Sequence, residues 1–240
     1  MNEKGDIITT KKIDFIPLLL IVVFQLLEAV LSVLIAPYTQ DIEFRYSLVW
    51  FFSKLIPLII GIIIYRKRFI EEGKKTFKNI FKFLMYVLVS YFVFYLFQLA
   101  ASYYQTFMDK LFEIGESTNQ NTIIDYFEAS NTTINYVLLF LVVVILAPLL
   151  EELLFRELIF SAFKGTKQII PIILSAVLFG ILHLSSFSLI ELAYFPLYFI
   201  PGFAFALIYH YSNHNIYTNF LVHSVSNLIS FIVIMASLGM

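Results

Sequence analysis

The sequence predicts an all-α fold, a polytopic bundle of membrane-spanning helices, and two observations support this prediction. Hydrophobic residues make up 60% of the 240 residues, charged residues only 14%, and the mean hydropathy is +0.86. Soluble domains average about 45–50% apolar and about 25% charged residues. Apolar runs of about 20 residues, the length that crosses a bilayer as a helix, recur along the chain. We expect a single membrane domain over 1–240 with seven transmembrane helices, or eight if one is split.

Each predicted span is bounded by a change from apolar to polar sequence. The first is too long for a signal-peptide core and no small-residue cleavage site follows it, so we expect it to be retained. Pro196 and Pro201 are expected to kink or split the sixth span. A polar, acidic loop is expected over 105–133. The predicted spans cover residues 14–36, 46–65, 79–104, 134–163, 168–184, 190–211 and 216–237.

The basic residues predict the orientation of the bundle. With seven spans, most lysines and arginines fall on one side, and cytoplasmic loops carry an excess of these residues. The N-terminus is therefore expected in the cytoplasm and the C-terminus outside, as in a multi-pass protein of a bacterial plasma membrane. The cluster between the second and third spans is also expected to attract anionic lipid headgroups, at about 1 kcal/mol per cation. The residues on this side are Lys4, Lys11, Lys12, Arg66, Lys67, Arg68, Lys74, Lys75, Lys78, Lys82, Lys164 and Lys167.

The composition excludes several classes of function. The chain has no cysteine, so it has no disulfide, no thiolate nucleophile and no cysteine-based metal site. No serine stands in a GxSxG context, and a covalent mechanism therefore has no evident nucleophile. No soluble segment combines a basic patch with aromatic residues, so we expect no nucleic-acid partner.

The fourth predicted span carries charges in the middle of an apolar run. Placing one charged residue at the centre of a bilayer costs about 2.5–3.5 kcal/mol even on the lenient insertion scale. Glu152 and Arg156 are four residues apart and share one helix face, in the favourable order for an ion pair. Glu151 points about 100° away and has no local partner, so we favour a functional role for it. Glu157 is expected near the cytoplasmic surface.

Two later spans carry polar residues at a similar estimated depth. His183 ends the sequence FGILH in the fifth span, and His223 and Asn227 share one face of the seventh, four residues apart. Each could be a packing residue, since hydrogen bonds between membrane helices contribute only about 0.6 kcal/mol on average. Their common depth instead favours one shared polar cavity with Glu151.

Two further pairs of polar residues are interpreted as structural rather than catalytic. Glu28 and Lys54 both fall in the middle of their predicted spans and are expected to form an ion pair. His210 and His214 have the spacing of metal ligands, but Tyr211 occupies the position of the glutamate in an HExxH motif. We interpret these two histidines as interfacial.

A glutamate, two histidines and an asparagine in a shielded cavity can activate water. Glu151 would act as the general base, with a histidine orienting the water. His223 and Asn227 could donate hydrogen bonds to an oxyanion. Alternatively, Glu151, His183 and His223 could hold zinc and leave one position for water. Both schemes lead to hydrolysis of an acyl bond.

Three motifs resemble those of the CPBP family of intramembrane proteases. EELLFR begins at Glu151, FGILH ends at His183 and HSVSN begins at His223, similar in order and spacing to EExxxR, FxxxH and HxxxN. The family contains the type II CAAX prenyl endopeptidases and bacterial relatives known as Abi or bacteriocin-immunity proteins. The similar part of the chain covers about 134–230. The chain departs from many relatives in having Glu157 where they have glycine, which affects packing beside the motif.

The resemblance implies a glutamate-dependent endopeptidase without a cofactor, with zinc as the alternative. It implies that Glu151 and His183 activate water, and that His223 and Asn227 form the oxyanion site. Supporting roles are implied for Glu152, Arg156 and Phe179. The expected substrate is a membrane-associated peptide or a lipidated protein, processed as in CAAX proteins or as a bacterial peptide.

Two other functions compete with this reading. The chain could be a non-catalytic immunity or scaffold protein that retains the protease fold, although a scaffold has no need of the complete motif set. It could also be a transporter, but the inverted repeats and paired broken helices expected of one are not found in the sequence.

Overall fold

The computed structural model describes residues 42–129 and 132–239 together with isolated positions between 19 and 37. The first predicted span, and Glu28 within it, lie outside the described residues apart from those positions. The regular structure of the described residues is helical, which confirms the all-α prediction. In chain order the helices are α2 (Ile42–Phe77), α3 (Ile80–Phe112), α4 (Thr118–Ala129), α5 (Thr133–Phe140), η2 (Leu141–Leu146), α6 (Ala147–Glu152), η3 (Leu153–Leu158), α7 (Ile159–Ala162), α8 (Ile169–Leu182), α9 (Leu189–Ala193), α10 (Phe195–Tyr211) and α11 (Ile216–Ser237).

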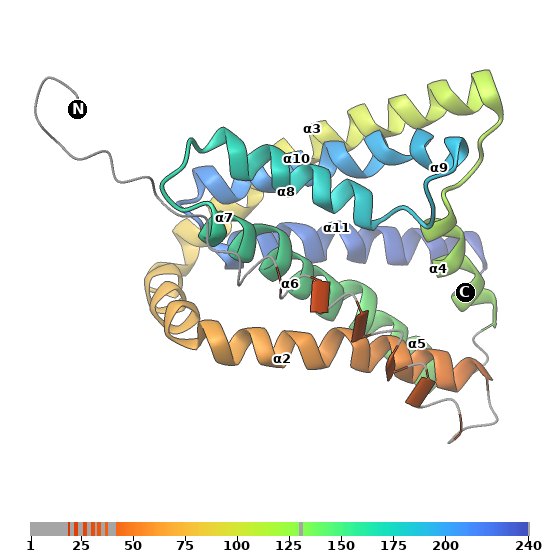
Figure 1. The fold of residues 1–240 in the computed structure, drawn as a ribbon, viewed down its shortest axis with the longest axis horizontal. Helices are drawn as coiled ribbons and strands as arrows, with labels where there is room; N and C mark the ends of the chain where they lie inside the picture. The colour runs from red at the N-terminus through yellow and green to blue at the C-terminus, as the bar shows by residue number, and fades with distance from the viewer. Residues whose placement is uncertain are drawn as a thin grey trace, which may run out of the picture.

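Six of the seven predicted spans correspond to described helices. Five helical segments among the described residues are long and apolar enough to cross a membrane, and α8 is a shorter apolar helix. The fourth predicted span is one continuous helix from α5 to α7 in which two π-helical turns, η2 and η3, interrupt the α-helix. Figure 1 shows these helices lying side by side, with α2 and α3 on opposite sides of α11.

Two segments predicted to be loops are largely helical. The basic stretch after residue 65 continues α2 to Phe77, and only Lys78 and Asn79 separate it from α3. The acidic stretch 105–133 holds the end of α3 and the whole of α4. Both loop predictions were wrong, because these stretches are polar in composition but keep the spacing of apolar residues that a helix requires. In α4, Ile123 and Phe127 are four residues apart and pack into the core beside α11.

The sixth span is split, as predicted, but the break comes before the prolines. Helix α9 ends at Ala193 and α10 begins at Phe195, with Tyr194 between them. Pro196 then lies in the first turn of α10, where its missing N–H removes no helical hydrogen bond. Pro201 remains inside α10.

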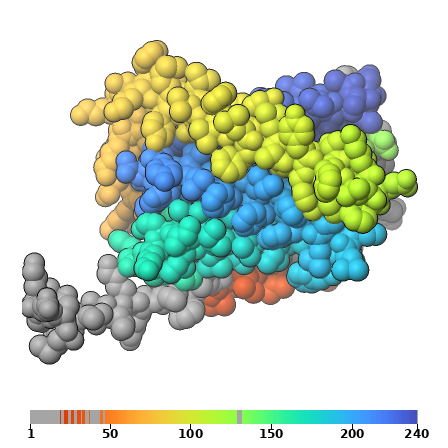
Figure 2. Space-filling model, turned by 90° about the horizontal axis from the view of Figure 1, so that it is seen from above, coloured from red at the N-terminus to blue at the C-terminus, as the bar shows by residue number. Residues whose placement is uncertain are grey.

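Helices α8 and α10 approach closely because each has a glycine at the contact. A Cβ on Gly202 would lie 2.9 Å from Cδ1 of Phe179, and a Cβ on Gly180 would lie 2.7 Å from Cε2 of Phe195. Both distances are shorter than real Cβ contacts. Figure 2 shows α3 in yellow lying across this face of the molecule, beside the blue of α10. The close packing brings Phe179, and the end of α8 after it, against α10.

Candidate active site

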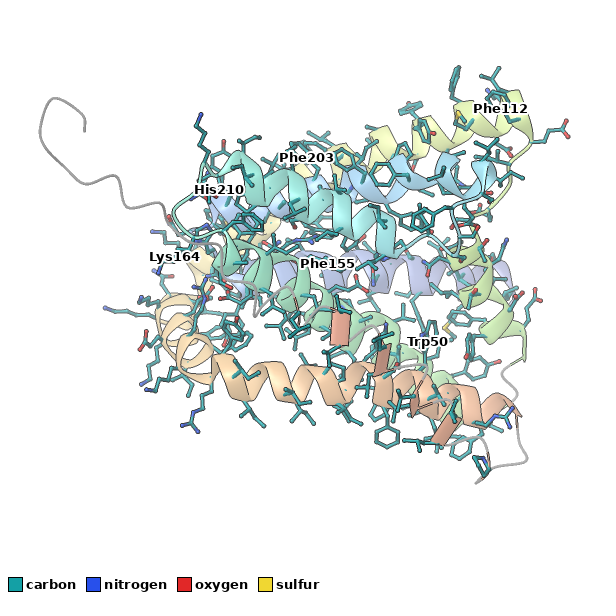
Figure 3. All side chains as sticks on the ribbon, in the orientation of Figure 1. Trp50, Phe112, Phe155, Lys164, Phe203 and His210 are labelled. Atoms are coloured by element: carbon teal, nitrogen blue, oxygen red, sulfur yellow. The ribbon has the colours of Figure 1, made fainter. Side chains whose placement is uncertain are left out.

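A cavity of about 550 Å³ lies among the helices that carry the three motifs. Its wall includes Glu151 from α6, His183 from the end of α8, and His223 and Asn227 from α11. The prediction of one shared polar cavity is therefore confirmed. Figure 3 shows Phe155, another residue of the wall, in the middle of the molecule between its two ends.

The predicted ion pair beneath the cavity is confirmed. Nε of Arg156 lies 3.1 Å from Oε2 of Glu152, and both side chains are fully buried. The guanidinium carbon also lies 5.0 Å from the ring centre of Phe179 and 5.3 Å from that of Phe205. Nη1 of Arg156 donates a hydrogen bond to Oγ of Ser175, at 3.4 Å. The pair is thus fixed between α6, α8 and α10.

Glu152 also accepts hydrogen bonds from two side chains of α11. Nδ1 of His223 donates to Oε1 at 2.9 Å, and Nδ2 of Asn219 donates to Oε2 at 2.9 Å. The sequence reasoning missed Asn219, although it precedes His223 by the same four residues that separate His223 from Asn227. Asn219 also donates to the carbonyl of Phe205 at 2.8 Å, so it connects α10, α11 and the ion pair.

Glu151 has a different environment from its neighbour. Its Oε2 lies 3.9 Å from Nε2 of His183 and 3.7 Å from Nε2 of His223, and the side chain is 19% exposed. These distances exceed those of a direct hydrogen bond, and polar atoms at such a separation are suited to a bridging water. The carboxylate therefore lies close to two imidazole nitrogens without a direct hydrogen bond to either, and a water on the cavity side can contact the carboxylate and an imidazole together.

The orientation of His183 is fixed on three sides. Its Nδ1 donates to the carbonyl of Phe179 at 2.7 Å, so this nitrogen carries the proton. In the neutral ring, Nε2 then presents a lone pair toward Glu151. The ring lies between Phe179, at 4.3 Å between ring centres, and Tyr198, at 4.9 Å and nearly parallel. Sequence reasoning identified Phe179 and missed Tyr198, which lies on α10 with no motif spacing to mark it.

Asn227 has a structural hydrogen bond as well as a place in the cavity wall. Its Nδ2 donates to the carbonyl of Val143 at 2.9 Å. The neighbouring Ala147 N–H bonds to Val142 five residues back, the π-helical register. In that register the N–H facing Val143 would come from Pro148, which has none. Asn227 thus satisfies a carbonyl that the proline leaves unpaired, and one amide N–H remains for a ligand.

A second buried cluster lies at the other end of the fourth span. Glu157, predicted near the cytoplasmic surface of the membrane, is buried within the protein with 2% of its surface exposed. Its Oε2 lies 2.8 Å from Nε of Arg68 and accepts a hydrogen bond from the Tyr209 hydroxyl at 2.6 Å. His214 stacks on Tyr209, with 5.2 Å between ring centres. Glu157 therefore forms an ion pair that joins the fourth span to α2.

Lys54 lies in the cavity wall. The ion pair predicted between it and Glu28 lies outside the described residues, because Glu28 is not among them. Within residues 42–129 and 132–239, no group of three or more histidine, aspartate or glutamate side chains is arranged to hold a metal ion.

Comparison with known proteins gives matches in the region that carries the motifs. A model of the family described as type II CAAX prenyl endopeptidase Rce1-like matches residues 133–229. An uncharacterized protein of Mycoplasma capricolum is 35% identical over 170 residues, 70% of this chain and 49% of that protein. A candidate membrane peptidase of Bacillus subtilis, YdiL, is 34% identical over 127 residues, 52% of this chain and 46% of that protein.

The chain thus spans about half the length of the curated relatives it matches. No solved structure gives a significant match. The family match includes all three motif segments, and it confirms the resemblance drawn from them.

Proposed function

We propose that this chain is an intramembrane endopeptidase that uses water activated by Glu151 and His183, and the match of residues 133–229 to the CAAX-type endopeptidase family supports this proposal. The observation that supports this most is that Oε2 of Glu151 lies 3.9 Å from Nε2 of His183 and 3.7 Å from Nε2 of His223, too far for a direct hydrogen bond. Both carboxylate oxygens of the neighbouring Glu152 accept hydrogen bonds, whereas Glu151 lies in the cavity wall.

In the proposed reaction a water lies between Glu151 and His183. It donates one hydrogen bond to the carboxylate and one to the Nε2 lone pair of His183. Its oxygen attacks the carbonyl carbon of a peptide bond, and Glu151 accepts the proton that the water loses. The C–N bond then breaks and Glu151 delivers the proton to the leaving amine. General-base catalysis of this kind contributes about 10²–10⁴-fold.

The oxyanion that forms needs donors on the other side of the carbonyl. Asn227 has one amide N–H beyond the one given to Val143. His223 donates Nδ1–H to Glu152, so its Nε2 can donate only when the ring is protonated. The proposed oxyanion role of His223 therefore requires an imidazolium, whose charge would be balanced by Glu152.

The buried ion pair would position the site without touching the substrate. Arg156 fixes Glu152, and Glu152 in turn fixes the Nδ1 side of His223. The same contacts set the direction of the adjacent Glu151 backbone. We assign Glu152, Arg156 and Phe179 to this supporting role, and we take the protein to act without a metal or other cofactor.

The substrate class is proposed from the family match alone. Rce1-like proteins are described as CAAX prenyl endopeptidases, so the substrate is proposed to be a membrane-associated peptide or a lipidated protein, in a bacterial plasma membrane. The competing proposal is a non-catalytic immunity or scaffold protein of the same fold. The orientation of the His183 lone pair toward Glu151 argues against it, because a purely structural pair would gain more from direct contact.

The test compares purified wild-type protein with Glu151→Gln in detergent. Each is incubated with a library of membrane peptides, with and without a chelator, and the products are read by mass spectrometry. The proposal expects cleavage by the wild type in both conditions and by the variant in neither. Equal products from both proteins would refute the role of Glu151, and loss of cleavage with chelator would favour the metal alternative.

A further inference from the structure

The cavity occupies only one half of the bundle. Its wall takes Trp50 from the start of α2, Gln105 from the end of α3, and residues of α4 such as Thr122. From α8 it takes only the C-terminal end, and from α11 the positions from His223 onward. Figure 3 shows Trp50 and Phe112 at one end of the molecule and Lys164 and His210 at the other. The cavity therefore runs from the centre toward the end that holds α4.

Exposure along the wall shows where the cavity opens. Glu116 and Thr122, beside and within α4, are exposed. At the centre, Phe155 and Phe179 are 2% and 4% exposed. The cavity is thus closed in the middle of the bundle and open at the α4 end.

The charges of the two ends differ in sign. The end of the bundle opposite the opening, called the closed end here, carries Lys74 and Lys75 in the last turn of α2. It also carries Lys164 and Lys167, between α7 and α8. The segment between α3 and α4, at the open end, is acidic instead. The uneven distribution of lysine and arginine orients membrane proteins with the basic end in the cytoplasm. The charged residues of α3, α4 and the segment between them at the open end are Asp109, Lys110, Glu113, Glu116, Asp125 and Glu128, and the start of α2 adds Arg45.

We infer that the cavity is filled from the outer, non-cytoplasmic face, by an extended polypeptide segment of a secreted peptide or of the outer part of a membrane protein. This inference rests on the proposed protease function and specifies its substrate. A lipidated C-terminus made in the cytoplasm would meet the closed end, where α7, α8 and α10 pack around Tyr209.

The chemistry of the wall fits a peptide chain. Beside apolar side chains such as Ile123 and Phe231, the wall offers neutral side chains that both donate and accept hydrogen bonds, among them Gln98, Gln105, Asn119, Gln120 and Ser226. Such groups match the N–H and C=O groups of an extended backbone. An isoprenoid chain has no group to pair with them, and burying them against it without partners would be unfavourable.

The natural absence of cysteine allows a direct test in intact cells. Three full-length variants each carry one cysteine: Thr122→Cys at the opening, Ser226→Cys within the cavity, and Lys164→Cys at the closed end as the matched control. Cells are treated with a membrane-impermeant maleimide before or after permeabilisation, and the labelled fraction of the purified protein is measured. We expect Thr122→Cys and Ser226→Cys to be labelled in intact cells and Lys164→Cys only after permeabilisation.

Two results would overturn the inference. One is labelling of Ser226→Cys only after permeabilisation, and the other is labelling of Lys164→Cys in intact cells. Ser230→Cys, at an exposed position of the same wall, replaces Ser226→Cys if that variant does not accumulate. The labelling pattern does not depend on catalysis. A wild-type protein that cleaves no peptide would therefore refute the proposed function while leaving the measured direction of opening intact.

Discussion

Two buried clusters of charge lie on the same continuous helix, and they differ in how completely their carboxylates are paired. In the first, Glu157 contacts Arg68 at 2.8 Å and the hydroxyl of Tyr209 at 2.6 Å. In the second, Glu152 is paired equally well, but Glu151 beside it lies 3.7–3.9 Å from its two imidazole neighbours. The incomplete pairing distinguishes a site built for a ligand from an ion pair built for packing.

The paired cluster joins four helices at the basic end. Besides Glu157 and Tyr209, Arg68 is near Glu72, whose Oε1 accepts the backbone N–H of Ile216 at the start of α11. Arg68 keeps 45% of its side chain exposed, which weakens its electrostatic contribution through solvent screening. The cluster is therefore expected to affect folding modestly and chemistry hardly at all.

The largest expected effect separates the two clusters directly. Glu151→Gln removes the proposed general base and should lower the cleavage rate by about 10²–10⁴-fold, because an amide cannot accept the proton. The melting temperature in detergent should stay near that of the wild type, since no hydrogen bond within the described part of the chain ends on Glu151.

The matched control is Glu157→Gln, five and six residues from the two motif glutamates. It should lose about 1–3 kcal/mol of stability, because it weakens buried hydrogen bonds to charged groups, and it should keep the cleavage rate of the folded fraction. If both variants lost cleavage equally at unchanged stability, the distinction between the clusters would be wrong.

The next effect concerns the ion pair beneath the cavity. Arg156→Met leaves Glu152 buried and uncompensated, and breaking such a pair typically costs about 3–5 kcal/mol. We expect loss of both folded protein and cleavage. Normal accumulation of this variant would contradict the structural importance of the pair.

A double variant sharpens the same point. Glu152→Gln with Arg156→Met removes both charges, and replacing a buried pair by neutral groups is often close to neutral in stability. Folded protein should therefore return, as measured by yield and melting temperature. Cleavage should not return, because His223 loses the carboxylate that would balance its protonated form.

A smaller effect is expected at Tyr198, which stacks on His183. Tyr198→Leu removes the aromatic contact, worth about 0.5–1.5 kcal/mol, and should lower the turnover rate by roughly threefold to tenfold. Tyr198→Phe keeps the ring and loses the hydrogen bonds of the hydroxyl, to Ser117 and Asn119, so its turnover should be closer to that of the wild type. Equal losses in the two variants would assign the effect to the hydroxyl rather than to the stacking.

The sequence predicted which polar residues share the cavity better than it predicted the ends of the helices. The ion pair of Glu152 and Arg156 was predicted from their four-residue spacing. It forms although Arg156 lies in the π-helical turn η3. The π-helical turns themselves were not predicted, because they arise from packing and from Pro148 rather than from a pattern of apolar residues. Asn219 could have been found from its spacing to His223.

Tyr198 could not have been found from the sequence. Its contact with His183 depends on the close approach of α8 and α10, which Gly180 and Gly202 permit. Nor could composition alone reveal which end of the cavity is open, because that depends on where α4 folds back. Contacts between distant segments were thus the part that required the structure.

The smallest expected effect is a dependence of stability on pH at the basic end. Burial lowers the pKa of the His214 imidazole, and the nearby charges of Arg68 and His210 lower it further. The unfolded chain, with an ordinary pKa of about 6.5, therefore binds a proton before the folded protein does. The stability that His214 contributes is fully present above about pH 6.5 and is lost as the pH falls toward its lower folded value.

His214→Phe keeps an aromatic ring against Tyr209 and Phe160 and cannot be protonated. Its melting temperature in detergent should fall less than that of the wild type between about pH 7.5 and pH 5.5, the range around the ordinary histidine pKa. At the upper end of this range the two proteins should be similar, because the wild-type ring is neutral there in both states. A wild-type stability that rises on acidification would contradict this prediction, because it would mean that the folded protein binds a proton at His214 more tightly than the unfolded chain does.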